Sequence, residues 1–257
     1  MNKRGQVTIF VIIAILVVAI VAIVIIFWTD LIPQKEDTVT REYAPLQNYM
    51  QSCLEQSLAD VIYINSIQGG YYIVDGEFIV YNDNDLYVDS LVPYYLINQQ
   101  LLVPSEEELE NQFSYGIKEQ FGECLDLSEF EYNISYDYDS IRVNSDIREN
   151  VIRVELDSSI HVNEGETSVI LKNFTAEQTT SYLEYYNFAK YLAEKQKADI
   201  DTLCLSCLVK ETEAREYNLY LDSVVSKDSY ILINTLNNKK DDLFFGFAYK
   251  FEYEDEI

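Results

Sequence analysis

The sequence predicts an α+β protein with a single N-terminal transmembrane helix, a helical stem and an extracytoplasmic domain rich in antiparallel sheet. Three observations predict this: an uncharged apolar run near the N-terminus, stretches with helical periodicity in the first half, and alternating strands in the second half. The 257 residues carry 44 acidic and 18 basic side chains, a net charge of −26 that repels nucleic acid. One His and eight Gly leave no HExxH motif and no glycine-rich phosphate loop.

The apolar run extends from Val7 to Trp28, 22 residues without a charge. As a helix it would span roughly 33 Å, enough for the core of a bilayer. Lys3 and Arg4 precede the run and acidic residues follow it, so the N-terminus is expected in the cytoplasm and the bulk of the chain outside the membrane. The rest of the chain then holds 16 basic and 44 acidic residues, a net charge of −28.

The residues before this run, Lys3-Arg4-Gly5-Gln6, do not form an ordinary secretory signal, because the run is too long and no small-x-small cleavage site follows it. They resemble the class III signal peptide of archaeal type IV pilins and archaellins. The resemblance implies that a prepilin peptidase cuts after Gly5 and that Gln6 becomes the new N-terminus. Phe10 stands where many members of that family carry Glu, which argues against a major filament subunit. An uncleaved anchor is the alternative.

Beyond the membrane run, residues 29–45 are predicted to be a stalk or a helix break, and an amphipathic helix follows from Leu46 to Gly69-Gly70. Short strands at 78–81 and 86–88 flank an Asx-rich turn whose register does not fit a calcium loop. Ser105 opens a further helix as part of a capping box.

Strands dominate the second half. We expect strands near 130–138, 152–156, 217–225, 229–236 and 243–253, and a helix from about Gln178 to Ala198. The chain is therefore divided into a signal and transmembrane helix (1–30), a stalk and helical proximal region (31–128), and a sheet-rich distal domain with one long helix (129–257).

A second resemblance rests on a set of residues spread from Cys53 to Cys124. The set comprises Cys53, Ile67-Gln68-Gly69-Gly70-Tyr71, Val92-Pro93-Tyr94-Tyr95, Pro104-Ser105 and Cys124. It resembles a group of N-terminally anchored surface proteins encoded by small archaeal genomes. The resemblance supports the membrane topology and implies no chemistry.

The four cysteines allow three pairings. Cys53 and Cys124 lie on the apolar faces of two predicted helices, and their pairing is favoured in an oxidising compartment. Cys204 and Cys207 form a CxxC, predicted to be a second disulfide or a capped turn. A thioredoxin-like redox pair would need a preceding strand, and a four-Cys zinc site would need a second closely spaced pair.

Other candidate residues carry weaker signals. His161 lies in a predicted strand with no nucleophile elbow near it, so a general base is not expected. The sequons at Asn133 and Asn173 are candidate glycosylation sites under the predicted topology. The 22 tyrosines are expected mainly to pack in sheets rather than to bind glycans.

These patterns favour a non-enzymatic, membrane-anchored surface protein of pilin-like type with a structural, assembly or adhesion role. The alternatives are a tethered receptor or adhesin that does not polymerise and, more remotely, a CxxC thiol oxidoreductase. No cofactor and no metal are expected. The expected partners are the bilayer through Val7–Trp28, a prepilin peptidase, and the protein itself or other envelope proteins.

Overall fold

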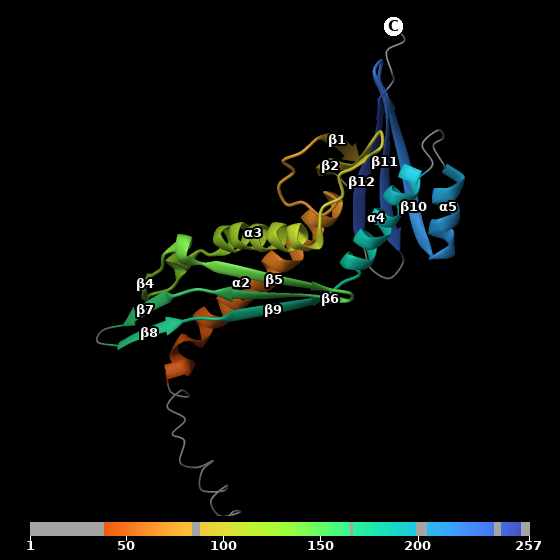
Figure 1. Cartoon of the computed structure of the whole chain (residues 1–257). Coiled ribbons are helices and arrows are strands. Elements are labelled where there is room, and N and C mark those ends of the chain that lie inside the picture. Colours follow the sequence, from red (N-terminus) through yellow and green to blue (C-terminus); the bar gives the residue numbers. More distant parts are fainter. Residues whose placement is uncertain (1–38, 84–87, 165–166, 199–204, 239–242, 253–257) are drawn as a thin grey trace, which may run out of the picture. The chain divides into compact units, whose positions relative to one another are not determined.

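The computed structural model describes residues 39–83, 88–164, 167–198, 205–238 and 243–252 (Figure 1). The predicted membrane run and the processing residues Lys3 to Gln6 lie outside these ranges. Among the described helices, none is long and apolar enough to cross a bilayer. The chain divides after Pro45 into two compact units, and the second, Leu46–Ile257, contains the sheets.

The longest described helix is α2 (Val39–Ile67), which starts earlier than predicted and contains Pro45. The stalk or helix break predicted for residues 29–45 is therefore wrong for its last part, from Val39 to Pro45, and residues 29–38 lie outside the described ranges. From Leu46 onward the predicted apolar stripe is confirmed. Its buried members are Leu46, Met50, Cys53, Leu54, Leu58, Val61 and Ile62. A stripe of this length and period fixes which face of the helix packs on the domain.

Helix α2 ends in a closely packed turn formed by two glycines. Gly69 and Gly70 have φ angles of +56° and +96°, and the Gly70 amide bonds the Asn65 carbonyl at 2.6 Å. A Cβ at Gly69 would lie 2.6 Å from the Gly246 carbonyl oxygen and 2.8 Å from Cγ of Pro93. Glycine is required here both by the backbone conformation and by the closeness of two strands.

Three sheets occur in the described ranges. The largest has the order β1-β2-β12-β11-β10, with β3 (Gln100–Leu101) beside β2. Its strands are β1 (Phe78–Asp83), β2 (Val88–Ile97), β10 (Tyr217–Val225), β11 (Ser229–Asn238) and β12 (Phe244–Glu252). All pairs are antiparallel except β12 with β2. The sheet thus draws strands from both sides of residue 128, so the predicted proximal and distal regions share it.

The two smaller sheets have the orders β5-β6-β9 and β4-β7-β8. Their strands are β4 (Asn133–Ser135), β5 (Arg142–Arg148), β6 (Val151–Asp157), β7 (Ile160–Glu164), β8 (Thr167–Leu171) and β9 (Phe174–Thr179). On β6, Ile152, Val154 and Leu156 are buried and alternate with more exposed residues, as the sequence predicts. All these pairs are antiparallel.

The strand predicted for 130–138 is mostly wrong, since only Asn133–Ser135 is extended and paired. Short 3₁₀ turns flank it at Leu127–Glu129 and Tyr138–Ser140. Carboxylates of Asp126 and Asp137 accept bonds from the amides two residues on, the Asx-turn geometry that competes with a strand.

Three further helices pack on these sheets: α3 (Glu106–Cys124), α4 (Tyr182–Ala198) and α5 (Leu205–Ala214). The Ser105 cap of α3 is confirmed, because its hydroxyl accepts the Glu108 amide at 3.1 Å. Helix α4 starts later than predicted, since residues 174–179 pair with β6 as strand β9. Helix α3 packs on β5, α4 on β12 and β2, and α5 on β10.

Aromatic side chains form the core between these helices and the largest sheet. The Tyr182 ring lies 4.9 Å from that of Phe113 on α3 and 5.8 Å from that of Phe245 on β12. Tyr95 on β2 lies 5.3 Å from Phe247 on β12. The predicted packing role of the tyrosines is confirmed for these rings, all of them fully buried.

Candidate functional site

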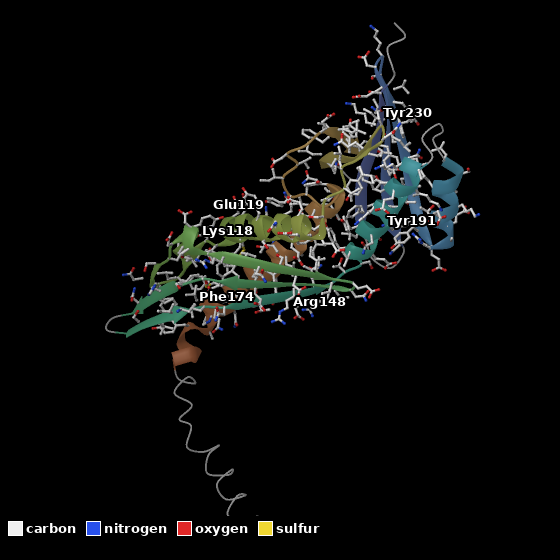
Figure 2. The ribbon with its side chains drawn as sticks, in the orientation of Figure 1. Lys118, Glu119, Arg148, Phe174, Tyr191 and Tyr230 are labelled. Carbon is white, nitrogen blue, oxygen red and sulfur yellow. A yellow bond between two sulfur atoms is a disulfide. The ribbon has the colours of Figure 1, made fainter. Side chains whose placement is uncertain are left out.

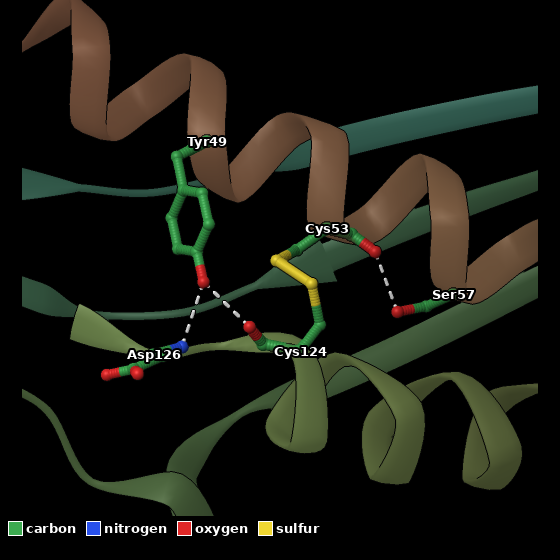
Figure 3. Close-up of a disulfide and its surroundings, with 5 residues drawn as sticks. All are labelled: Tyr49, Cys53, Ser57, Cys124 and Asp126. Carbon is green, nitrogen blue, oxygen red and sulfur yellow. Dashed lines mark hydrogen bonds between the residues drawn. A yellow bond between two sulfur atoms is a disulfide. The ribbon is translucent and has the colours of Figure 1, made fainter. Parts of the chain in front are cut away.

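The best-defined polar and covalent cluster lies where α2 meets the end of α3 (Figure 3). A disulfide joins Cys53 to Cys124, with the two Cα atoms 5.7 Å apart and a sequence separation of 71. Cys53 is 2% exposed and belongs to the buried stripe of α2, whereas Cys124 is the last residue of α3. The predicted pairing is confirmed.

Tyr49 holds the same junction by hydrogen bonds. Its hydroxyl donates to the Cys124 carbonyl at 2.7 Å and accepts the Asp126 amide at 2.9 Å, so it closes the C-terminal end of α3 (Figure 3). Tyr49 lies four residues before Cys53 and therefore on the same face of α2. The sequence placed Tyr49 on the apolar face but gave no signal of its two backbone bonds.

The outer side of α3 carries a second polar cluster, centred on Tyr138. The Tyr138 ring stacks so closely on the helix that a Cβ at Gly122 would lie 2.5 Å from its Cε2 atom. Its hydroxyl lies 3.0 Å from the Glu119 carboxylate and 3.1 Å from the Lys118 carbonyl (Lys118 and Glu119 are labelled in Figure 2). Desolvation, then the bond to Glu119, raises the pKa of Tyr138 to about 12.

The described element that precedes the CxxC along the chain is helix α4, not a strand. Cys204 falls outside the described residues, and Cys207 lies in α5, which follows α4 along the chain. The expectation of a helix before the motif is confirmed, and this order does not match the strand–CxxC–helix order of a thioredoxin site.

His161 lies on β7, exposed, with Ser135 of β4 as its Cα partner in the register. Nucleophilic catalysis needs a base bonded to its nucleophile in a site that excludes water. The described contacts contain no bond between these two side chains, and the strand face is open to solvent.

Both sequons are accessible in the structure. Asn133 is exposed on β4, an edge strand of its sheet, and Ser135 is exposed beside it. Asn173 is exposed with φ of +57° in the turn between β8 and β9, and Thr175 is exposed on β9. Glycosylation at either position stays a prediction.

A hollow of about 380 Å³ opens between α4 and the start of β10. The Arg215 guanidinium lies 4.5 Å from the ring centroids of both Phe188 and Tyr191, and Tyr217 stacks on Phe188 at 4.9 Å (Tyr191 is labelled in Figure 2). Phe188 and Tyr217 are only 4% and 6% exposed. Of the two rings that the arginine covers, Phe188 is buried and Tyr191 is half-buried, so the guanidinium packs on them as part of the fold.

The solvent face of β5-β6-β9 gathers three of the six arginines of the chain: Arg142, Arg148 and Arg153. Arg153 pairs with Glu155 at 2.9 Å and Glu177 at 3.5 Å, and Arg148 pairs with Asp146. These ion pairs are exposed, and pairs of this kind contribute about 0–1 kcal/mol. The face is an exposed array of ion pairs, and a hollow lined in part by Arg142, Glu155 and Asp157 adjoins it.

Within the described ranges, no group of three or more His, Cys, Asp or Glu side chains could hold a metal ion. Searches of protein-family models, curated proteins and solved structures find no match to this chain. The α2–α3 junction cross-links two helices through the disulfide, and the Tyr49 hydroxyl bonds backbone groups at the end of α3.

Proposed function

We propose that this chain is a membrane-anchored, extracytoplasmic surface protein of pilin-like type, with a structural, assembly or adhesion role. The apolar run Val7–Trp28 would hold it in the bilayer, with Lys3 and Arg4 on the cytoplasmic side. The acidic α+β domain would then lie outside the membrane.

The observation that carries the proposal is the Cys53–Cys124 disulfide. Structural disulfides persist in oxidising compartments and are rare in the reducing cytosol. A cross-link between two helices, with Cys53 buried and Cys124 half-buried, supports export of the domain that contains them. The basic residues before the membrane run favour the same orientation independently.

Insertion of the apolar run into the membrane can be tested by substituting charged residues at its centre. Its 17 Ile, Val, Leu and Phe residues provide roughly −5 to −10 kcal/mol for insertion, and each central Lys costs about 3 kcal/mol. We expect full-length protein to resist alkaline carbonate extraction from membranes. The variant Ile15→Lys/Val18→Lys should be extracted, and the control Ile15→Leu/Val18→Leu should not. Extraction of the wild-type chain would overturn the proposal.

Processing is tested by intact-mass and N-terminal analysis of the protein from native membranes. A mature chain that begins at Gln6 supports a prepilin-type peptidase and the pilin-like class. A chain that begins at Met1 or Asn2 supports a plain anchor and removes processing from the proposal. The same spectrum before and after deglycosylation reports on Asn133 and Asn173.

The alternative is a tethered binding module that does not polymerise, and Phe10 favours it. In the family that the N-terminus resembles, an acid at this place neutralises the terminal amine of a neighbouring subunit. Imaging of labelled protein on cells separates the two functions. Label along filaments supports assembly, and label spread over the envelope supports the tethered module.

A further inference from the structure

Strand β10 ends the largest sheet and pairs only with β11 among the described strands. Its exposure grows along its length, from Tyr217 at 6% to Val225 at 68%. Four large apolar side chains of its second half are exposed: Tyr220, Leu221, Val224 and Val225. Because consecutive residues point to opposite faces, both faces of this half-strand are open.

A free strand edge presents backbone N–H and C=O groups that fit one kind of partner, another extended chain. Edge strands are usually protected by lysines, prolines or bulges. The nine residues of β10 contain no Lys and no Pro, and their pairing with β11 is continuous without a bulge. Asp222 is their only acidic side chain, and its carboxylate accepts the Ser223 amide at 2.7 Å, a local bond that strand pairing through this amide would replace.

The charge of the chain limits the choice of partner. A basic partner would be drawn to the acidic surface of a molecule with a net charge of −26. Strand β10 offers such a partner a single carboxylate, so attraction of opposite charges does not account for an exposed apolar edge. An identical strand suits it better, because apolar residues can face apolar residues.

An antiparallel register centred on Ser223 places compatible side chains of two β10 strands opposite each other. A twofold axis normal to the sheet requires that paired residue numbers have the same parity. With Ser223 opposite itself, Leu221 faces Val225 on both sides of the axis, and Asp222 faces Val224 instead of another Asp222. Shifting the axis to Asp222 would set two carboxylates opposite each other, which is destabilising.

We propose that the free edge of β10 binds β10 of a second copy of this chain, antiparallel about Ser223, so that two sheets join into one. The contact is isologous and closes at two copies. It goes beyond the proposed function and does not require it, since the edge is present wherever the protein resides.

Hydrogen exchange of the full-length protein in detergent solution tests the contact. As protein concentration rises, we expect dimers by light scattering and about tenfold slower exchange of the amides in Tyr220–Val225. The variant Leu221→Lys/Val225→Lys should remain monomeric, because a charged edge resists strand addition. The matched control Phe78→Lys/Val80→Lys changes two exposed apolar residues of β1, the other edge strand of the sheet, and should still dimerise.

Both variants lower the net negative charge by the same amount, which weakens repulsion between copies. Loss of dimers in the β10 variant alone therefore reports on the edge and not on net charge. Far-UV circular dichroism checks that each variant folds. Monomers at every concentration of the wild-type chain, dimers in the β10 variant, or protection on β1 in place of β10 would each overturn the proposal.

A cysteine pair tests the register. In the proposed dimer the two Ser223 Cα atoms face each other at about 5 Å, whereas the two Asp222 Cα atoms are about 8 Å apart. Disulfides need Cα atoms within about 7 Å. On mild oxidation, the Ser223→Cys variant should form a disulfide between residue 223 of the two copies, and the Asp222→Cys variant should form none between its two copies. Linkage through Asp222→Cys alone would contradict the register.

Discussion

Removing the Cys53–Cys124 disulfide should weaken the domain substantially without changing its fold. The bridge closes a loop with a sequence separation of 71 residues. In the chain-entropy model such a loop lowers the entropy of the unfolded chain by about 15 cal/mol/K, which stabilises the folded state by about 4 kcal/mol at 25 °C. Domains are usually stable by only about 5–15 kcal/mol, so this is a large fraction.

The comparison uses two full-length proteins. Both carry Cys204→Ala and Cys207→Ala, and one also carries Cys53→Ala and Cys124→Ala, so that only the bridge differs. We expect the free energy of unfolding in urea to fall by about 4 kcal/mol and the melting temperature by about 10 °C. Far-UV circular dichroism of the folded state should not change, because Tyr49 still bonds the end of α3.

A loss below about 1 kcal/mol would refute the reasoning. It would mean that the unfolded chain is already compact across this loop, so that the bridge removes little entropy. A loss of the folded state altogether would mean that the bridge is needed for the α2–α3 packing itself, which the chain-entropy account does not predict.

Three further predictions concern the turn after α2, the end of α3 and the tyrosines with raised pKa values. Gly69→Ala should destabilise by about 1–3 kcal/mol in thermal melts, because of its positive φ and blocked Cβ, whereas Gly76→Ala, with open space around it, should change stability by less than about 0.5 kcal/mol. Tyr49→Phe should cost about 1–3 kcal/mol in urea unfolding, since it removes bonds to a carbonyl and an amide; an unchanged midpoint would exclude a capping role. Burial raises the pKa of Tyr186 to about 12, and burial together with the hydrogen bond to Glu119 raises the pKa of Tyr138 to about 12. These tyrosines ionise more easily in the unfolded chain, so the free energy of unfolding should fall as pH rises from 10 through 12. Titration at 295 nm should show tyrosines that ionise only as the protein unfolds.

The helices and their buried faces were largely predictable from the sequence. In α3 the capping box and the spacing of Leu109, Phe113 and Ile117 gave both its start and its buried side. These signals are local, because a helix bonds to itself within four residues. The start of α4 was predicted too early, since Gln178 fits a helix equally well until its strand partner Ile152 is known.

Strand existence was predictable but strand pairing was not. The alternation in 243–253 anticipated β12, yet nothing local indicates that Ala248 pairs parallel with Tyr94, more than half the chain away. Pairing depends on which surfaces collapse together, which a single sequence does not encode at short range. The Asx turns at Asp126 and Asp137 were overlooked for another reason, since aromatic alternation through 130–138 outweighed them.

The cysteine pairing was predictable for a physical reason. Cys53 and Cys124 occupy apolar faces, and two buried faces of neighbouring helices meet. The roles of Tyr49 and Tyr138 were not predictable, because each bonds main-chain groups whose position depends on the folded helix ends. The sequence alone does not show which distant backbone carbonyl a tyrosine hydroxyl will bond.

The central claim, an anchored domain outside the membrane, is tested most directly by protease shaving of intact cells that express the full-length chain. The account predicts that protease releases peptides of the domain, and that those containing Cys53 and Cys124 are joined until reductant is added. If protease released these peptides only after the cells were lysed, and if Cys53 and Cys124 could be alkylated without reductant, the result would contradict this topology.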